Sequence, residues 1–179
     1  VHINGQDVAY EAVSEEIPLP DENGGTDATL FMTSYLRLNA EKTGRPILFA
    51  FNGGPGSASV FLHLGGLGPQ IIDLGDGISA PFDPPFRMKE NAACILDICD
   101  MVFMDPVGCG YSRALTGNAV KKYASSQEDA KAMLLGIDRF LSRHKRWNCP
   151  IFILGESYGT VRAALMAQQL YENMLGNTC

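Results

Sequence analysis

Four short apolar runs along the chain predict the strands of a central sheet. The run from Leu30 to Leu38 is typical of a strand. Ile47–Phe51, Met101–Met104 and Ile151–Leu154 are compact and almost wholly apolar, as strands are when a parallel sheet buries both of their faces. We therefore expect a sheet at the centre of the molecule, with these three runs inside it.

Apolar positions also recur with a helical period in two segments. Ser125 and Glu128 predict a capping box at the start of the first segment, which extends to His144. Its apolar face consists of Ala130, Met133, Leu134, Ile137, Phe140 and Leu141. A second helix is expected to follow Ser157 and to end at Gly176. Strands that alternate with helices predict an α/β fold with right-handed crossovers.

The remaining segments are rich in turn-forming residues. Residues 1–29 are acidic and contain Pro18, Pro20 and Asn23-Gly24-Gly25, so we expect a strand fragment or two and a hairpin turn there, and no functional site. Residues 30–179 are expected to form the main unit. Glycine and proline also crowd the segment from Leu74 to Phe86, which predicts a surface loop.

Composition narrows the possible classes of function. The 179 residues are 46% hydrophobic and 19% charged, which is typical of about one globular domain. The net charge of −6 has the wrong sign for a nucleic-acid partner. The apolar runs are far shorter than the roughly 20 residues of a membrane-spanning helix, and Val1–Gly5 lacks the basic and apolar parts of a signal peptide. We expect neither nucleic-acid binding nor a membrane span nor a signal peptide in this chain.

The five cysteines are Cys94, Cys99, Cys109, Cys149 and Cys179. Their odd number leaves at least one unpaired within the chain, and their spacing is a poor match to a zinc site. We expect small buried apolar residues, with room for one disulfide among them. No metal or cofactor is expected.

The sequence Gly155-Glu156-Ser157-Tyr158-Gly159 lies between a predicted strand and a predicted helix. This is the context of a nucleophile elbow, in which glycines let a tight turn close and the serine projects above the sheet. The N–H of Tyr158 would then be one oxyanion-hole donor. The alternative interpretation is an ordinary helix cap that uses Ser157 as a hydrogen-bond acceptor.

A glycine-rich turn, Asn52-Gly53-Gly54-Pro55-Gly56-Ser57, follows another predicted strand. Such turns expose backbone N–H groups at the carboxyl edge of an α/β sheet. A phosphate-binding loop would need a lysine or a third glycine at the right spacing, and neither is present. The turn is therefore better interpreted as the second part of an oxyanion hole.

Four motifs in one order resemble the serine carboxypeptidase family of α/β-hydrolases, over about Leu30 to Tyr171. They are Phe51-Asn-Gly-Gly-Pro-Gly-Ser-Ala-Ser59, Leu67-Gly-Pro69, Asp105-Pro-Val-Gly-Cys-Gly-Tyr-Ser112 and Gly155-Glu-Ser-Tyr-Gly159. The resemblance implies Ser157 as nucleophile and the N–H groups of Gly54 and Tyr158 as oxyanion hole. It implies that Asn52 and a protonated Glu156 bind the terminal carboxylate of a peptide substrate. It also implies an extracytoplasmic location, which is secreted, periplasmic, vacuolar or lysosomal.

The chain departs from the family pattern at two places near the expected site. Ser57 stands where the family often has a cysteine, so one familiar disulfide is not expected. Gly66 stands where an acidic residue often precedes Leu-Gly-Pro, which leaves Glu156 without its usual like-charge neighbour. This second departure weakens the expectation of strict carboxypeptidase specificity.

A third departure concerns the catalytic triad. In α/β-hydrolases an Asp or Glu and then a His follow the nucleophile, but after Ser157 this chain has no Asp and no His, only Glu172. His144 belongs to a basic helix end, and the family pattern makes Asp105 part of a structural turn.

We therefore expect a partial α/β-hydrolase fold, a mostly parallel sheet with flanking helices that lacks the later strands and the cap. The carboxypeptidase activity would be incomplete in this chain and would need the missing C-terminal part of the catalytic domain as partner. An esterase or acyltransferase on the same core, or a non-catalytic ligand-binding fragment, is the alternative.

Overall fold

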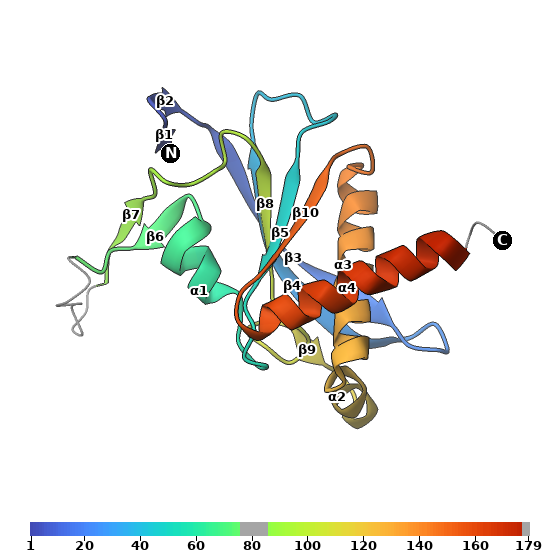
Figure 1. Cartoon of the computed structure of the whole chain (residues 1–179). Helices are drawn as coiled ribbons and strands as arrows, with labels where there is room; N and C mark the ends of the chain where they lie inside the picture. The colour runs from blue at the N-terminus through green and yellow to red at the C-terminus, as the bar shows by residue number, and fades with distance from the viewer. Residues whose placement is uncertain (76–85, 177–179) are drawn as a thin grey trace.

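The computed structural model describes residues 1–75 and 86–176, and its main feature is a six-stranded sheet (Figure 1). The strand order is β10-β5-β8-β4-β3, with β9 also paired to β4. The strands are β3 (Tyr10–Pro20), β4 (Thr26–Arg37), β5 (Ile47–Phe51), β8 (Asp100–Met104), β9 (Arg113–Ala114) and β10 (Ile151–Gly155). All four predicted strands are confirmed. The predicted surface loop lies largely outside the described residues.

The sheet has a parallel and an antiparallel part. β5 pairs in parallel with both β10 and β8, as the compact apolar runs predicted. β4 pairs antiparallel with β8, β3 and β9. The β3–β4 hairpin turns through a short connection in which Asp21 Oδ1 accepts the N–H groups of Asn23 and Gly25, both at 2.8 Å. Short connections favour antiparallel pairing, whereas the parallel strands are joined through helices. The α/β fold with a central sheet is confirmed.

The N-terminal segment is part of this sheet. β3 pairs with β4 along its whole length, and Ile17 and Leu19 are buried in the core. Glu16, Pro18 and Pro20 alternate with these apolar positions and are exposed, whereas Glu15 lies on the same side as Ile17 and pairs with His144 of α3. The sheet therefore continues without a break across residue 29.

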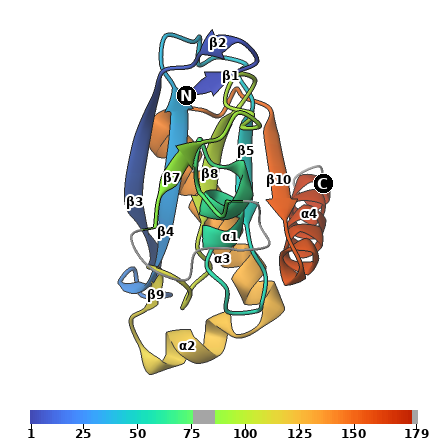
Figure 2. The ribbon, with the colours of Figure 1, turned by 90° about the vertical axis from the view of Figure 1, so that its left-hand side faces the viewer.

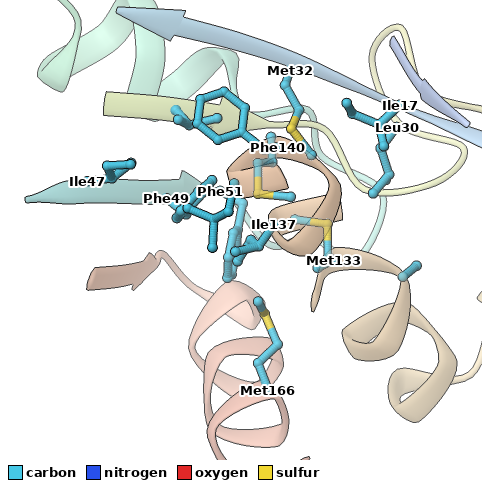
Figure 3. Packing of buried hydrophobic residues seen from close by; sticks show 14 of the residues in the cluster. Ile17, Leu30, Met32, Ile47, Phe49, Phe51, Met133, Ile137, Phe140 and Met166 are labelled. Carbon is cyan, nitrogen blue, oxygen red and sulfur yellow. The ribbon is translucent and has the colours of Figure 1, made fainter. Parts of the chain in front are cut away.

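Helices and loops cover both faces of the sheet (Figure 2). α3 (Ser126–His144) and α4 (Tyr158–Gly176) pack on the face formed by Ile47, Phe49 and Phe51. Phe49 meets Phe140 of α3 edge to face, with ring centroids 5.5 Å apart, and Met166 of α4 joins the same cluster (Figure 3). The opposite face, with Leu48 and Ala50, packs against Leu62, Leu67 and the N-terminal residues. This alternation along one strand is what a two-sided buried sheet requires.

The smaller elements flank the sheet. They are β1 (His2–Ile3), β2 (Gln6–Asp7), α1 (Val60–Leu62), the π-helix η1 (His63–Leu67), β6 (Gln70–Ile72), β7 (Met88–Glu90) and α2 (Gly117–Tyr123). Thr116 caps α2 by accepting the N–H of Ala119. The predicted capping box of α3 is wrong, because the side chain of Ser125 makes no cap hydrogen bond. Its carbonyl instead accepts the N–H of Asp129.

The four described cysteines, Cys94, Cys99, Cys109 and Cys149, are buried free thiols. This confirms their interpretation as small buried residues, and the one possible disulfide is not formed among them. Cys149 also has a polar role, since its sulfur accepts a hydrogen bond from Arg146 Nε and donates one to the carbonyl of Lys42. In the described parts of the chain, no helix combines the length and apolar character needed to cross a membrane, and no cluster of ligating side chains could hold a metal ion.

Candidate active site

The site forms where two neighbouring parallel strands end. Phe51, the last residue of β5, is paired with Gly155, the last residue of β10. The next residues, Asn52 and Glu156, therefore leave the sheet side by side, and the N–H of Glu156 donates to the carbonyl of Phe51 at 3.2 Å. The carboxyl edge of a parallel sheet is where ligands bind in α/β proteins.

Ser157 occupies a tight turn between β10 and α4. Its φ of +56° lies in the left-handed region, which side chains rarely adopt outside functional turns. The glycines on either side are required, because a Cβ on Gly155 would lie 2.0 Å from the carbonyl oxygen of Gly159. A Cβ on Gly159 would lie 2.9 Å from the carbonyl oxygen of Phe51. This backbone has the geometry of a nucleophile elbow, and Ser157 is exposed at its tip.

The glycine-rich turn after β5 lies directly against the start of α4. A Cβ on Gly53 would lie 2.4 Å from the backbone nitrogen of Tyr158, so only glycine permits this approach. Gly54 has a φ of +103° and leads into Pro55. Within the described residues, no carbonyl accepts the N–H of Gly54 or of Tyr158. Both groups are therefore available to a ligand, at the positive end of the α4 dipole.

Asn52 is held in one orientation by three hydrogen bonds. Its Oδ1 accepts the N–H of Leu62 at 2.9 Å, which fixes Nδ2 on the other side of the amide. Nδ2 donates to Glu156 Oε2 at 2.9 Å. Its main-chain carbonyl accepts from Arg162 at 2.8 Å. The two residues that the resemblance assigns to carboxylate binding are thus in direct contact.

An open hollow of about 440 Å³ brings these groups together. It is lined by Asn52, Gly54, Ser57, Phe61, Leu62, Glu156 and Ser157. Ser57 takes part in the turn by donating its N–H to the carbonyl of Gly53 at 3.1 Å. Gly66 lies in η1, where its carbonyl accepts from Asn91. The hollow is therefore lined by the hydroxyl-bearing Ser57 and Ser157, by Gly54 and by the amide–carboxyl pair of Asn52 and Glu156.

Each of the three histidines in the chain is engaged away from Ser157. His2 pairs with Asp7 at 2.8 Å, and His144 pairs with Glu15 at 2.7 Å. The basic helix end thus meets a carboxylate on β3, besides the α3 dipole. The ring of His63 stacks on that of Phe103 and its Nε2 lies 2.6 Å from the hydroxyl of Tyr35. Burial lowers the pKa of His63 to about 4, against a smaller opposite effect of Asp105.

Burial raises the pKa of Tyr35 to about 12, so its hydroxyl keeps its proton while it is hydrogen-bonded to Nε2 of His63. The hydroxyl of Tyr35 thus gives the imidazole of His63 a structural hydrogen-bond partner.

Asp105 is part of a structural turn, as the family resemblance implied. Its Oδ1 accepts both the N–H and the hydroxyl of Ser59, each at 2.8 Å, and its Oδ2 accepts the N–H of Tyr111. Gly110 leaves room for this carboxylate, because a Cβ there would lie 1.9 Å from Oδ2. Asp105 therefore ties the turn after β8 to the end of the glycine-rich loop.

Sequence reasoning missed Arg162 and Asp129, which form a buried ion pair at 2.7 Å. Burial raises the pKa of Asp129, and the charge of Arg162 opposes that shift. The available signal was a pair of opposite charges on helix faces that are otherwise apolar. This signal is weak, because helices often present such charges to solvent.

Comparison of the sequence with known proteins shows the family to which the chain belongs. The sequence profile described as serine carboxypeptidase matches residues 21–177. The chain therefore belongs to the serine carboxypeptidase family, as the four motifs implied.

Curated relatives agree with this assignment. Serine carboxypeptidase S10 family member 1 of Dictyostelium discoideum is 24% identical over 157 residues, which are 86% of this chain and 34% of the relative. Retinoid-inducible serine carboxypeptidase of Homo sapiens is 29% identical over 151 residues, 82% of this chain and 30% of that protein. A peroxisomal α/β-hydrolase structure from Saccharomyces cerevisiae has a TM-score of 0.47 and 13% identity, and covers 89% of this chain and 40% of its own. The chain thus spans about a third of the length of these curated relatives.

Proposed function

We propose that this chain supplies the nucleophile and the carboxylate-binding pair of a serine carboxypeptidase, which releases C-terminal residues from peptides. The observation that supports this most is the position of Ser157, at a positive φ and in one hollow with the Asn52–Glu156 pair. A serine nucleophile beside a carboxylate-binding pair selects the last peptide bond of a chain. Family membership supports the same activity.

In the proposed reaction, Ser157 Oγ attacks the carbonyl carbon of the last peptide bond while its proton passes to a histidine base. The substrate oxygen becomes an oxyanion and accepts the N–H groups of Gly54 and Tyr158. The amine of the released residue leaves with that proton. Water then attacks the acyl-enzyme on Ser157 by the same route in reverse.

The Asn52–Glu156 pair would recognise the terminal carboxylate of the peptide. An ionised Glu156 repels a carboxylate, whereas a neutral Glu156 donates a hydrogen bond to it. Nδ2 of Asn52 has two hydrogens, of which one is used by Glu156. The second hydrogen and the Glu156 proton together form a donor pair for one carboxylate.

The base would come from the remaining part of the catalytic domain. All three histidines here have other partners, and β10 is the outermost strand of the described sheet. Ile151 and Phe152 are exposed on β10, beside an apolar hollow of about 390 Å³ that Leu134 and Leu170 help to line. We expect further strands to pair with β10 and cover this surface. An extracytoplasmic location stays a prediction that family membership supports.

Labelling and hydrolysis by the complete gene product test the proposed function. A fluorophosphonate probe should label Ser157, and blocked dipeptides with a free C-terminal carboxylate should be cleaved far better than the same dipeptides as C-terminal amides. Labelling with equal cleavage of both would indicate an esterase or acyltransferase. Tight ligand binding without labelling would indicate a binding module.

Glu156→Gln tests the carboxylate-binding role through pH. If a protonated Glu156 binds the carboxylate, the parent's affinity for free-acid peptides should fall with rising pH, because an ionised carboxyl group at this position would repel the bound carboxylate. The amide of Gln donates at every pH and has no charge, so KM in the variant should stay flat through the neutral range. The same alkaline rise in KM for both proteins would exclude Glu156 as the carboxylate ligand.

A further inference from the structure

A buried ion pair contacts the carboxylate-binding pair, and the proposed reaction makes no use of it. Arg162 is only 2% exposed although its guanidinium is permanently charged. Its Nε donates to Asp129 Oδ2 at 2.7 Å, and its Nη1 donates to the main-chain carbonyl of Asn52 at 2.8 Å. The guanidinium therefore joins α3, α4 and the loop that follows β5.

Stability alone is a weak reason to bury this pair. Two desolvated charges gain little over well-packed apolar side chains of similar volume. The pKa of Asp129 is raised by burial, which shows that its surroundings disfavour its charge. A geometric role, which an apolar pair could not supply, explains the arrangement better.

The loop that follows β5 needs such an anchor on this side. A cavity of about 350 Å³ lies against Pro55 and Gly56 and also borders Asp129 and Arg162. Close packing therefore does not fix the loop there. The guanidinium carbon also lies over two aromatic rings, 5.4 Å from the centre of Phe51 and 5.5 Å from that of Tyr158. The position of Arg162 is thereby set by both strand and helix.

The contact with Arg162 fixes the position of Asn52. Its carbonyl is held by Arg162, its Oδ1 by the N–H of Leu62, and its Nδ2 is left to face Glu156. We infer that Arg162, fixed by Asp129, is a positioning residue that holds Asn52 in register with Glu156 for binding of a substrate's C-terminal carboxylate. This inference rests on the proposed carboxypeptidase function.

The test compares substrate discrimination in the complete gene product. In Arg162→Met, KM for a blocked dipeptide with a free carboxylate should rise between about ten- and a hundredfold, the scale of a small misplacement of a binding group. KM for the matching amide should stay within about twofold, because the amide does not use the Asn52–Glu156 pair. In an Asn52→Ala background the same change at Arg162 should have little further effect, since coupled residues are not additive.

Two further variants separate positioning from folding. Arg162→Met leaves Asp129 without a counter-ion, and this variant could fail to fold. Arg162→Lys keeps the positive charge but lacks the forked donor of the guanidinium, so it tests the inference in that case. It should show the same loss of discrimination in smaller degree. The matched control is Arg146→Lys at the buried Arg146–Asp100 pair, 2.6 Å long and at the opposite strand ends. It should lower the melting temperature and leave the ratio of the two KM values unchanged.

The outcomes distinguish this inference from the function on which it rests. A parent that cleaves free-acid and amide peptides equally well overturns the proposed function and this inference with it. A parent that discriminates, with Arg162→Met and Arg162→Lys variants that discriminate equally well, overturns the inference alone. Equal losses for both substrates in the variants also overturn it, because they would indicate a general structural role.

Discussion

Single glycines set how closely the two loops of the site approach each other. In Gly53→Ala the new Cβ would lie 2.4 Å from the backbone nitrogen of Tyr158, so the loop must move away from α4. We expect fluorophosphonate labelling and peptide hydrolysis by the complete gene product to fall about a hundredfold, since the donors of Gly54 and Tyr158 lose their alignment. Gly117→Ala, at an open position, should retain full activity. Unchanged kinetics in Gly53→Ala would contradict the proposed oxyanion hole.

His63 should make the fold sensitive to acid. Its pKa is about 4 in the folded chain and 6.5 in the unfolded chain, so the unfolded state binds more protons between these values. The free energy of unfolding should therefore fall as the pH drops from 6.5 to 4, by about 1–3 kcal/mol from this residue. Urea unfolding of His63→Gln should show a shallower pH dependence.

The exposed His2 supplies the control for this pH experiment. His2→Gln should keep the parent's profile. If His63→Gln keeps it too, the buried neutral state of His63 is not what makes the fold acid-sensitive.

Among the elements, β3 connects the acidic N-terminal segment to the core. Ile17 is fully buried in the cluster beneath α3, whereas Glu16 next to it faces solvent. Ile17→Ala should lower the free energy of unfolding by about 2–5 kcal/mol, the cost of a core cavity. Glu16→Ala should change it by less than about 0.5 kcal/mol. Chemical denaturation measures both, and equal small effects would show that residues 1–29 do not stabilise the sheet.

The sequence predicted the central elements better than the edges for a physical reason. β5 and residues Met101–Met104 of β8 are buried on both faces and so are uninterrupted apolar runs, which are easy to recognise. β3 has one solvent-facing side. Its Glu and Pro residues interrupt the apolar pattern, so the sequence predicted only strand fragments where the structure has one long strand. α2 was missed because it is short and mostly polar. Periodicity detects burial, and elements with little burial give a weak signal.

Local sequence patterns predicted single elements of the site, but only the family resemblance indicated which of them come together. The context of Ser157 predicted an elbow from local residues alone. The contact between Asn52 and Glu156 joins positions 104 residues apart and follows from the register of β5 and β10, which no local pattern reveals. The Arg162–Asp129 pair depends on how α3 and α4 pack together. Motifs of the family therefore indicated the Asn52–Glu156 pairing, and neither these motifs nor local patterns indicated the Arg162–Asp129 pair.

At the scale of the whole molecule, the described sheet ends on an open strand that should require a partner. The outer edge of β10 is unpaired within the described residues, and Phe152 is 57% exposed there. Unpaired edges with apolar side chains promote association between chains. The isolated 179-residue chain should therefore associate in sedimentation experiments, and Phe152→Lys should reduce that association. A compact monomer without any partner would contradict this prediction.

The isolated chain should also lack activity, because none of its histidines is free to act as a base for Ser157. Ser157 has its strained turn and its backbone donors here, but the three histidines of the chain are bound to Asp7, Tyr35 and Glu15. A serine hydroxyl without a base is a weak nucleophile, and donors alone accelerate acyl transfer only slightly in absolute rate. The isolated chain should therefore react with a fluorophosphonate no faster than its Ser157→Ala variant, whereas the complete gene product should react with Ser157. Serine-dependent labelling of the isolated chain would show that a base exists within these residues.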